Sequence, residues 1–206
     1  IAKSIGMGLY KAACLAKIDG ETCDLRTPVT KDCHVEILTF DDEDGKKAFW
    51  HTTSHILAQA VKRLYPSAKL AIGPSIANGF YYDFDMAPLT REDLDAIEKE
   101  MKKVIKENPP IERYELPREE AIAFMKEKDE PYKVELIEDL SEDATISFYK
   151  QGDFTDLCAG PHLMSTKPVK AFKLTSLAGA YWRGNEKNKM LTRIYGTAFT
   201  KKADLE

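Results

Sequence analysis

The chain has too few cysteines, and too scattered, for a framework of disulfides. Only four of its 206 residues are cysteine, which favours a reducing, cytoplasmic setting. No apolar run approaches the roughly 18 residues of a membrane-spanning helix, so no membrane partner is expected. The opening segment "IAKSIGMGLY" lacks the layout of a secretory signal and an initiator methionine. We therefore expect a globular piece of a longer chain.

The chain also lacks the positive net charge of a general polyanion binder, because its formal charge is -4. Charge is unevenly placed, however, and residues 163–206 hold nine Lys or Arg against three Asp or Glu. Aromatic residues alternate there with cations, namely Tyr181, Trp182 and Tyr195 among Lys173, Arg183, Lys187, Lys189 and Arg193. This pattern is typical of a surface that binds phosphates and stacks on bases. A solvated face with core aromatics is the other interpretation.

Composition divides the chain into two units, with no internal repeat. Residues 1–44 predict a short helix in "IAKSIGMGLYKAACLA", a turn at Asp19-Gly20 and a β-rich stretch ending in "HVEILTF". The acidic run "DDEDG", Asp41 to Gly45, reads as a linker. Because so small a unit buries little apolar surface, a first strand or hairpin is expected upstream of it.

The second unit, residues 45–206, opens with a helix that contains "FWHTTSHILAQAVKRLY" and ends at Pro66. Thr90 and Asp93 stand in capping-box positions of a second helix, and "PREEAIAFMKEK" and "PYKVELIEDL" predict two more. Strand-type segments are "GFYYDFD", "IERYEL", "TISFYKQ", "DFTDLC", "AFKLTSL" and "MLTRIYG". The predicted fold class is α+β, an antiparallel sheet with helices packed on one side.

Three of the four histidines fall into two pairs with the same spacing. His51 and His55, four residues apart on a helix, share one face, and a position at the helix start would keep both rings neutral. Cys158 and His162 repeat the spacing in "DFTDLCAGPHL". The four side chains together form a ligand set typical of zinc, or a metal-free pocket in which an imidazole activates water. His34 lies outside both pairs and is expected to be structural.

Four segments in order, "FWHTTSHILAQAVKRLYP", "GPSIANGFYYDFD", "DFTDLCAGPH" and "GAYWRGNEKNKMLTRIYGTAF", resemble the N-terminal region of bacterial-type threonyl-tRNA synthetases. The resemblance implies a partial, β-grasp-like TGS domain at 1–44 and an editing domain at 45–206, related in outline to that of alanyl-tRNA synthetases. It also implies that ATP and a zinc ion belong to an aminoacylation core absent from this sequence. The family's homodimer contacts lie mainly in that core, which leaves the piece itself free to be a monomer.

The function implied by the resemblance is proofreading, in which seryl-tRNA(Thr) made in error is hydrolysed. Serine keeps the hydroxyl that a threonine site must recognise and lacks one methyl group, a difference worth about 1–3 kcal/mol. A second site that is too tight for the methyl group but accepts serine corrects the error. The implied partner is the acceptor end of tRNA(Thr) carrying serine, and editing is expected to need no cofactor, with zinc at the histidine and cysteine cluster as the alternative.

Carried over by position, the family's catalytic residues fall on His51, His55, Lys133, Asp156, Cys158 and His162, with Tyr81, Tyr82 and Tyr149 as substrate contacts. We expect His51 to activate or position water, and Lys133 to stabilise the oxyanion or move a proton. Asp156 would bind the substrate ammonium or orient an imidazole. Cys158 and His162 would hold the adenosine end or the water, and Cys158 is not expected to be the nucleophile.

Each assignment has a structural rival. Lys133 reads equally as a solvated lysine, Asp156 as a turn cap, and the three tyrosines as core residues. Two other functions also stay open. One is a module that binds the tRNA acceptor arm without hydrolysis, and the other is alanyl-type editing of seryl-tRNA(Ala).

Overall fold

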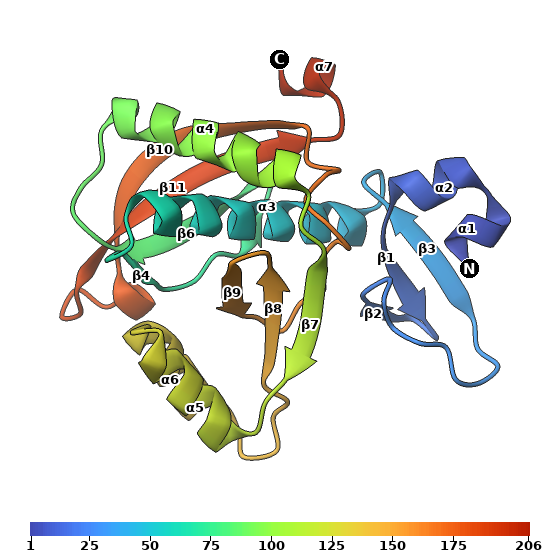
Figure 1. Ribbon diagram of the computed structural model, residues 1–206, viewed down its shortest axis with the longest axis horizontal. Coiled ribbons are helices and arrows are strands. Elements are labelled where there is room, and N and C mark those ends of the chain that lie inside the picture. Colours follow the sequence, from blue (N-terminus) through green and yellow to red (C-terminus); the bar gives the residue numbers. More distant parts are fainter.

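The computed structural model describes residues 1–206 and begins with a small N-terminal unit (Figure 1). Helices α1 (Ala2–Ile5) and α2 (Met7–Ala12) precede an antiparallel sheet of order β2-β1-β3, formed by β1 (Ala13–Ile18), β2 (Glu21–Cys23) and β3 (Val35–Thr39). The predicted helix over residues 1–16 is therefore wrong beyond Ala12. Leu15 instead packs against Leu38 of β3 and Ala48 of the next helix, so strand pairing and burial override the local helical pattern.

Helix α3 (Glu43–Leu64) is the centre of the molecule, and the N-terminal unit lies against one end of it (Figure 1). The predicted linker is wrong from Glu43 onward, because Asp42 occupies the N-cap position and the acidic residues Glu43 and Asp44 form the first turn. Acidic side chains there are stabilised by the helix dipole. The helix ends two residues before Pro66, as predicted.

A large antiparallel sheet covers one side of α3 (Figure 1). Its order is β10-β11-β6-β4, from β10 (Ala171–Tyr181), β11 (Met190–Phe199), β6 (Gly79–Asp85) and β4 (Lys69–Leu70), and β5 (Ser75–Ile76) also pairs with β6. Helix α4 (Arg91–Glu107) packs against α3. The predicted capping box is confirmed, with the Thr90 hydroxyl accepting the backbone N–H of Asp93 and the Asp93 carboxylate accepting that of Thr90.

A second, smaller antiparallel sheet has the order β7-β8-β9 and is formed by β7 (Ile111–Glu115), β8 (Ser147–Gln151) and β9 (Phe154–Leu157). Helices α5 (Arg118–Glu127) and α6 (Pro131–Glu138) pack beside it, and η1 (Trp182–Gly184) and α7 (Lys202–Leu205) complete the chain. The α+β class is confirmed. The strands of the second unit form two sheets, where the sequence predicted one.

The middle of α3 is buried on every side, from Ala48 to Val61 apart from His51. A helix in a globular protein usually buries one stripe, but α3 is enclosed by the large sheet, α4 and the small sheet (Figure 1). Polar side chains on it, including Thr52 and His55, are thereby carried into the interior. No helix has both the length and the apolar character needed to cross a membrane.

Candidate active site

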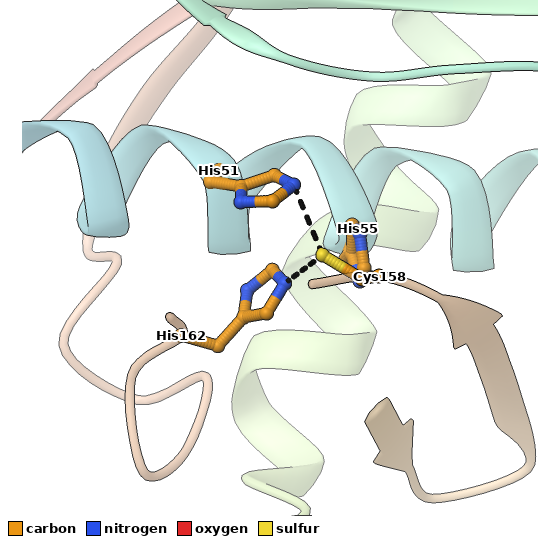
Figure 2. Close-up of side chains that lie close together, drawn as sticks. All are labelled: His51, His55, Cys158 and His162. Atoms are coloured by element: carbon orange, nitrogen blue, oxygen red, sulfur yellow. Dashed lines mark hydrogen bonds between the residues drawn. The ribbon is translucent and has the colours of Figure 1, made fainter. Parts of the chain in front are cut away.

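The structure brings the two spaced pairs together (Figure 2). Helix α3 supplies His51 and His55, and the loop that follows β9 supplies Cys158 and His162. One nitrogen or sulfur atom from each of the four lies within 4.8 Å of all the others. His55 and His162 are buried, whereas His51 and Cys158 are partly exposed. The cluster therefore opens to solvent at His51 and Cys158.

A line of hydrogen-bonding groups crosses the cluster. The Thr52 hydroxyl lies 2.9 Å from Nδ1 of His162, and Nε2 of that ring lies 3.1 Å from the Cys158 sulfur, which is 3.4 Å from Nε2 of His51. Thr52 also accepts the backbone N–H of Leu163. A Thr52 hydroxyl that donates to Nδ1 places the His162 ring proton on Nε2, facing the sulfur, whereas the other tautomer lets the Cys158 thiol donate to Nε2.

Asp156 lies behind His55 in a second buried group. Asp156 is only 1% exposed. Nζ of Lys133, which lies on α6, is 2.9 Å from Oδ1 of Asp156. The Tyr82 hydroxyl donates to Oδ2 at 2.6 Å, and Nε2 of His55 lies 3.5 Å from the same oxygen. Lys133 is buried, so it is not the solvated lysine of the rival interpretation.

Burial sets the protonation of the cluster. Desolvation and the neighbouring His55 lower the pKa of His51 to about 3, and desolvation lowers the pKa of His55 to about 4 despite Asp156. Desolvation, His55 and His51 also lower the pKa of His162 well below its usual range. All three rings are therefore neutral at physiological pH. Desolvation would raise the pKa of Asp156, but Lys133, His55 and the Tyr82 hydrogen bond outweigh it, and this pKa is lowered.

The sequence predicted neutral rings for His51 and His55, but it attributed their neutrality to the helix dipole, which is not the cause. His51 is the ninth residue of α3, about two turns from its start, and the helix dipole acts mainly within the first turn. The helix begins at Glu43, earlier than the sequence pattern indicated. Desolvation between the two sheets is what lowers the pKa values.

The four side chains fit a metal ion by residue type and by spacing. Zinc bound at about 2.0–2.3 Å in tetrahedral geometry separates its ligand atoms by about 3.3–3.8 Å, close to the two sulfur–nitrogen distances of the cluster. Asp156 beside His55 also resembles the carboxylate partners that orient metal-binding imidazoles. A thiol ligand must lose its proton, however, and desolvation raises the pKa of Cys158 to about 12. The group can thus hold a metal, or form a neutral, metal-free cluster.

Tyr149 packs on the far side of His162, beside Asp24 and Gly160, two residues that were not predicted to belong to the site. Its ring centroid lies 4.4 Å from that of His162, and its hydroxyl donates to Asp24 of the N-terminal unit at 2.7 Å. Gly160 is required here, because its φ is +77° and a Cβ atom would lie 2.0 Å from the Tyr149 hydroxyl. The Gly-Pro pair in "AGPH" indicated a turn at Gly160, whereas no sequence motif pointed to Asp24 as part of the site.

Some predicted residues lie away from the cluster. Tyr82 faces Asp156, so its neighbour Tyr81 faces the opposite side of β6, where the Arg193 guanidinium lies 3.8 Å from its ring centroid. His34 is exposed beside Glu36. Four of the five cations named among the aromatics pair with acids from other elements, namely Lys173 with Glu98, Arg183 with Asp139, Lys189 with Asp85 and Arg193 with Asp83. These pairs favour a solvated, charge-balanced face there.

Comparison with known families gives the class of the chain. Residues 1–39 match the TGS domain, and residues 146–195, from the end of the α6–β8 loop into β11, match the second additional domain of threonyl and alanyl tRNA synthetases. The TGS match ends at the last residue of β3. The chain thus combines a TGS domain with the editing-type domain of these synthetases.

Individual relatives narrow the class. The chain is 68% identical to a threonine–tRNA ligase of Acetivibrio thermocellus, 69% identical to one of Clostridium acetobutylicum and 67% identical to one of Clostridium tetani, in each case over its whole length. It covers 33%, 32% and 32% of these relatives, and so spans about a third of their length. The chain is thus similar over its whole length to about a third of each of these threonine–tRNA ligases, and the resemblance that the sequence motifs predicted is confirmed.

Proposed function

We propose that this chain hydrolyses seryl-tRNA(Thr), with residues 45–206 as the editing unit and the cluster of His51, His55, Cys158 and His162 as its centre. The observation that carries the proposal is the meeting of four neutral nitrogen and sulfur groups beside a buried Asp156–Lys133 ion pair. The substrate is an ester, so the reaction needs a positioned water, stabilisation of an oxyanion and recognition of the serine ammonium. We place the reaction in the cytoplasm, where aminoacyl-tRNA is used.

His51 is the residue best placed to hold the water. It is the only partly exposed histidine of the cluster, and its pKa of about 3 keeps the ring neutral. So low a pKa makes the ring a weak proton acceptor, which favours positioning of the water over full removal of its proton before attack. The water oxygen then bonds to the ester carbonyl carbon and loses a proton. The bond from that carbon to the adenosine oxygen breaks as the tetrahedral intermediate collapses, and the adenosine oxygen gains a proton and leaves as a hydroxyl.

Lys133 and Asp156 supply charge in an interior of low dielectric constant. The Lys133 ammonium is suited to stabilise the oxyanion of the intermediate. Oδ1 of Asp156 is buried and accepts no hydrogen bond of good geometry, although Lys133 lies beside it. A carboxylate oxygen in that state is suited to accept a charge-assisted hydrogen bond from the serine ammonium.

Cys158 and His162 complete the cluster without a covalent step. Because desolvation raises the pKa of Cys158 to about 12, the group is a thiol and a poor nucleophile in the absence of a metal. Were zinc bound, His51, His55, Cys158 and His162 would hold it as a complete set of four ligands, and the metal would supply a water of lowered pKa only if water replaced one of the four. Elemental analysis of protein purified without chelator decides between the two, since stoichiometric zinc would overturn the metal-free assignment.

The proposal is tested by the release of labelled serine from seryl-tRNA(Thr), measured beside threonine release from threonyl-tRNA(Thr) and with His51→Ala as the control variant. We expect the chain to release serine, to spare threonine and to lose about 100-fold in rate upon His51→Ala. Salt-dependent tRNA binding without release would favour the acceptor-arm module instead. Equal or faster release from seryl-tRNA(Ala) would favour alanyl-type editing.

A further inference from the structure

We infer that the N-terminal unit forms part of the editing site, because its Asp24 and Arg26 position His162. This inference rests on the proposed function and assigns a role to the TGS domain in it. Asp24 directly follows β2 and is only 5% exposed. Its Oδ1 accepts the backbone N–H of His162 at 2.7 Å, and its Oδ2 accepts the Tyr149 hydroxyl at 2.7 Å.

Arg26 also links the N-terminal unit to the loop that contains His162. Its Nη1 lies 2.6 Å from Oδ2 of Asp24. Its Nη2 donates to the carbonyl oxygen of Leu163 at 2.9 Å and to that of Ile111 at 2.7 Å. A single guanidinium therefore joins the N-terminal unit to the residue after His162 and to the first residue of β7.

These contacts fix the His162 ring through its backbone. Asp24 accepts the backbone N–H of His162, and Arg26 donates to the backbone carbonyl of Leu163. The Thr52 hydroxyl accepts the backbone N–H of Leu163 and contacts Nδ1 of the His162 ring. The ring is thereby aimed with Nε2 at the Cys158 sulfur. Without Asp24, the backbone N–H of His162 and the Tyr149 hydroxyl would be buried without an acceptor. Burying an unpaired hydrogen-bond donor destabilises the fold.

Asp24 contacts the peptide of His162 and not its ring nitrogens, so it is a positioning residue. Displacement of a catalytic group by about 1 Å lowers the rate about 100-fold. The loss of Asp24 is therefore expected in kcat, with little change in KM. The Asp83–Arg193 pair is a matched control, because its Asp is equally buried and accepts two hydrogen bonds from the Arg, yet it contacts none of the three clustered histidines.

The test uses two variants of the whole chain, Asp24→Ala and Asp24→Asn, both made together with Arg26→Met so that no guanidinium is left unpaired. Asparagine keeps an oxygen that can accept the His162 N–H, and alanine does not. Each variant is assayed for kcat and KM on seryl-tRNA(Thr) and for hydrogen exchange at the His162 amide by NMR. Asp83→Ala with Arg193→Met reports the effect of losing a buried pair elsewhere.

We expect the alanine variant to lose about 10–100-fold in kcat, as is usual when a supporting residue is removed, and to exchange the His162 amide at least about tenfold faster. The asparagine variant should recover the part of both losses that Asp24 causes, whereas the part caused by Arg26→Met is common to the two variants. Equal kcat and exchange in the two variants, or the same kcat loss in the Asp83 control, would overturn the inference. If the unaltered chain releases no serine, the proposed function fails, and the amide exchange alone then decides whether Asp24 positions His162.

Discussion

Two buried aspartates flank the histidine cluster, and their surroundings match closely. Each contacts one cation, one tyrosine hydroxyl and one histidine. The partners of Asp156 are Lys133, Tyr82 and His55, and those of Asp24 are Arg26, Tyr149 and His162. One aspartate comes from the editing-type unit and the other from the N-terminal unit.

The two differ in what their oxygens contact. Both oxygens of Asp24 accept hydrogen bonds, and its histidine contact is to the backbone. Asp156 faces a ring nitrogen of His55, and its Oδ1 accepts no hydrogen bond of good geometry. The same kinds of partner are thus arranged differently around the two carboxylates. Both oxygens of Asp24 accept hydrogen bonds, whereas Oδ1 of Asp156 faces only the Lys133 ammonium, and we propose that this oxygen also binds the substrate ammonium.

The largest effect is expected from Lys133→Met, which leaves the buried Asp156 carboxylate without its cation. Removing one partner of a buried ion pair costs about 3–5 kcal/mol, and urea unfolding measures this loss. Deacylation should fall at least about 100-fold, because oxyanion stabilisation is lost as well. The control is Lys133→Met with Asp156→Leu, which should regain stability but not activity. A loss of stability below about 1 kcal/mol, the value of an exposed pair, would contradict the account.

A smaller effect is expected from Gly160→Ala, on the Asp24 side of the cluster. Its φ of +77° is strained for alanine, at about 1–3 kcal/mol, and the new Cβ would meet the Tyr149 hydroxyl at 2.0 Å. Gly152→Ala is the matched control, since its φ is +61° but its nearest neighbouring atoms lie at 3.5 Å. Thermal unfolding and deacylation rates should fall more for Gly160→Ala. Equal effects would mean that Tyr149 does not restrain the loop.

The two tyrosine hydroxyls allow a direct comparison of the two sides. Tyr82→Phe should raise KM as well as lower kcat, because Asp156 would lose a hydrogen bond worth about 1.5–3 kcal/mol and with it its orientation toward the substrate. Tyr149→Phe should lower kcat alone. Tyr132→Phe removes a similar hydroxyl bond, to Asp85, outside the cluster, and should leave both constants within about twofold. Identical kinetic patterns for the first two variants would remove the proposed difference.

The smallest expected effect is that of pH. Because burial lowers the pKa of His51 to about 3 and that of His55 to about 4, both rings stay neutral as pH falls from about 8 to about 5. The enzymatic rate, corrected for spontaneous ester hydrolysis, should be flat from about pH 7 to about pH 5, where the substrate α-amino group (pKa about 7.7–8.0) is mostly protonated, and should fall as pH drops through about 4. An inflection near 6.5, the ordinary value for histidine, would show that the working histidine is solvated.

The sequence predicted the parts of this site that local patterns encode. Spacing placed His51 and His55 on one helix face, and the Thr90–Asp93 capping box fixed the start of α4. The meeting of α3 with the loop at Cys158 was expected from residue type and from family resemblance. Each of these rests on a short segment whose chemistry is visible within a few residues.

The remainder depends on contacts between distant segments. Asp24 and Arg26 sit in a short stretch with no chemical pattern, and only the packing of β2 against the His162 loop gives them a role. The division of the strands into two sheets follows from the burial of α3 on all sides. The same burial, and not the helix start, lowers the pKa values of the histidines. Propensity and spacing carry no information about these pairings.

The most direct test of the difference between the aspartates uses a substrate without its ammonium group. Single-turnover deacylation is measured for seryl-tRNA(Thr) and N-acetylseryl-tRNA(Thr), with the unaltered chain, Asp156→Asn and Asp24→Asn. If Asp156 binds the ammonium, Asp156→Asn slows seryl release by about 100-fold more than it slows release of N-acetylserine, while Asp24→Asn slows both substrates by the same factor. An equal loss on both substrates for Asp156→Asn would contradict the account and make Asp156, like Asp24, a residue that only holds the site together.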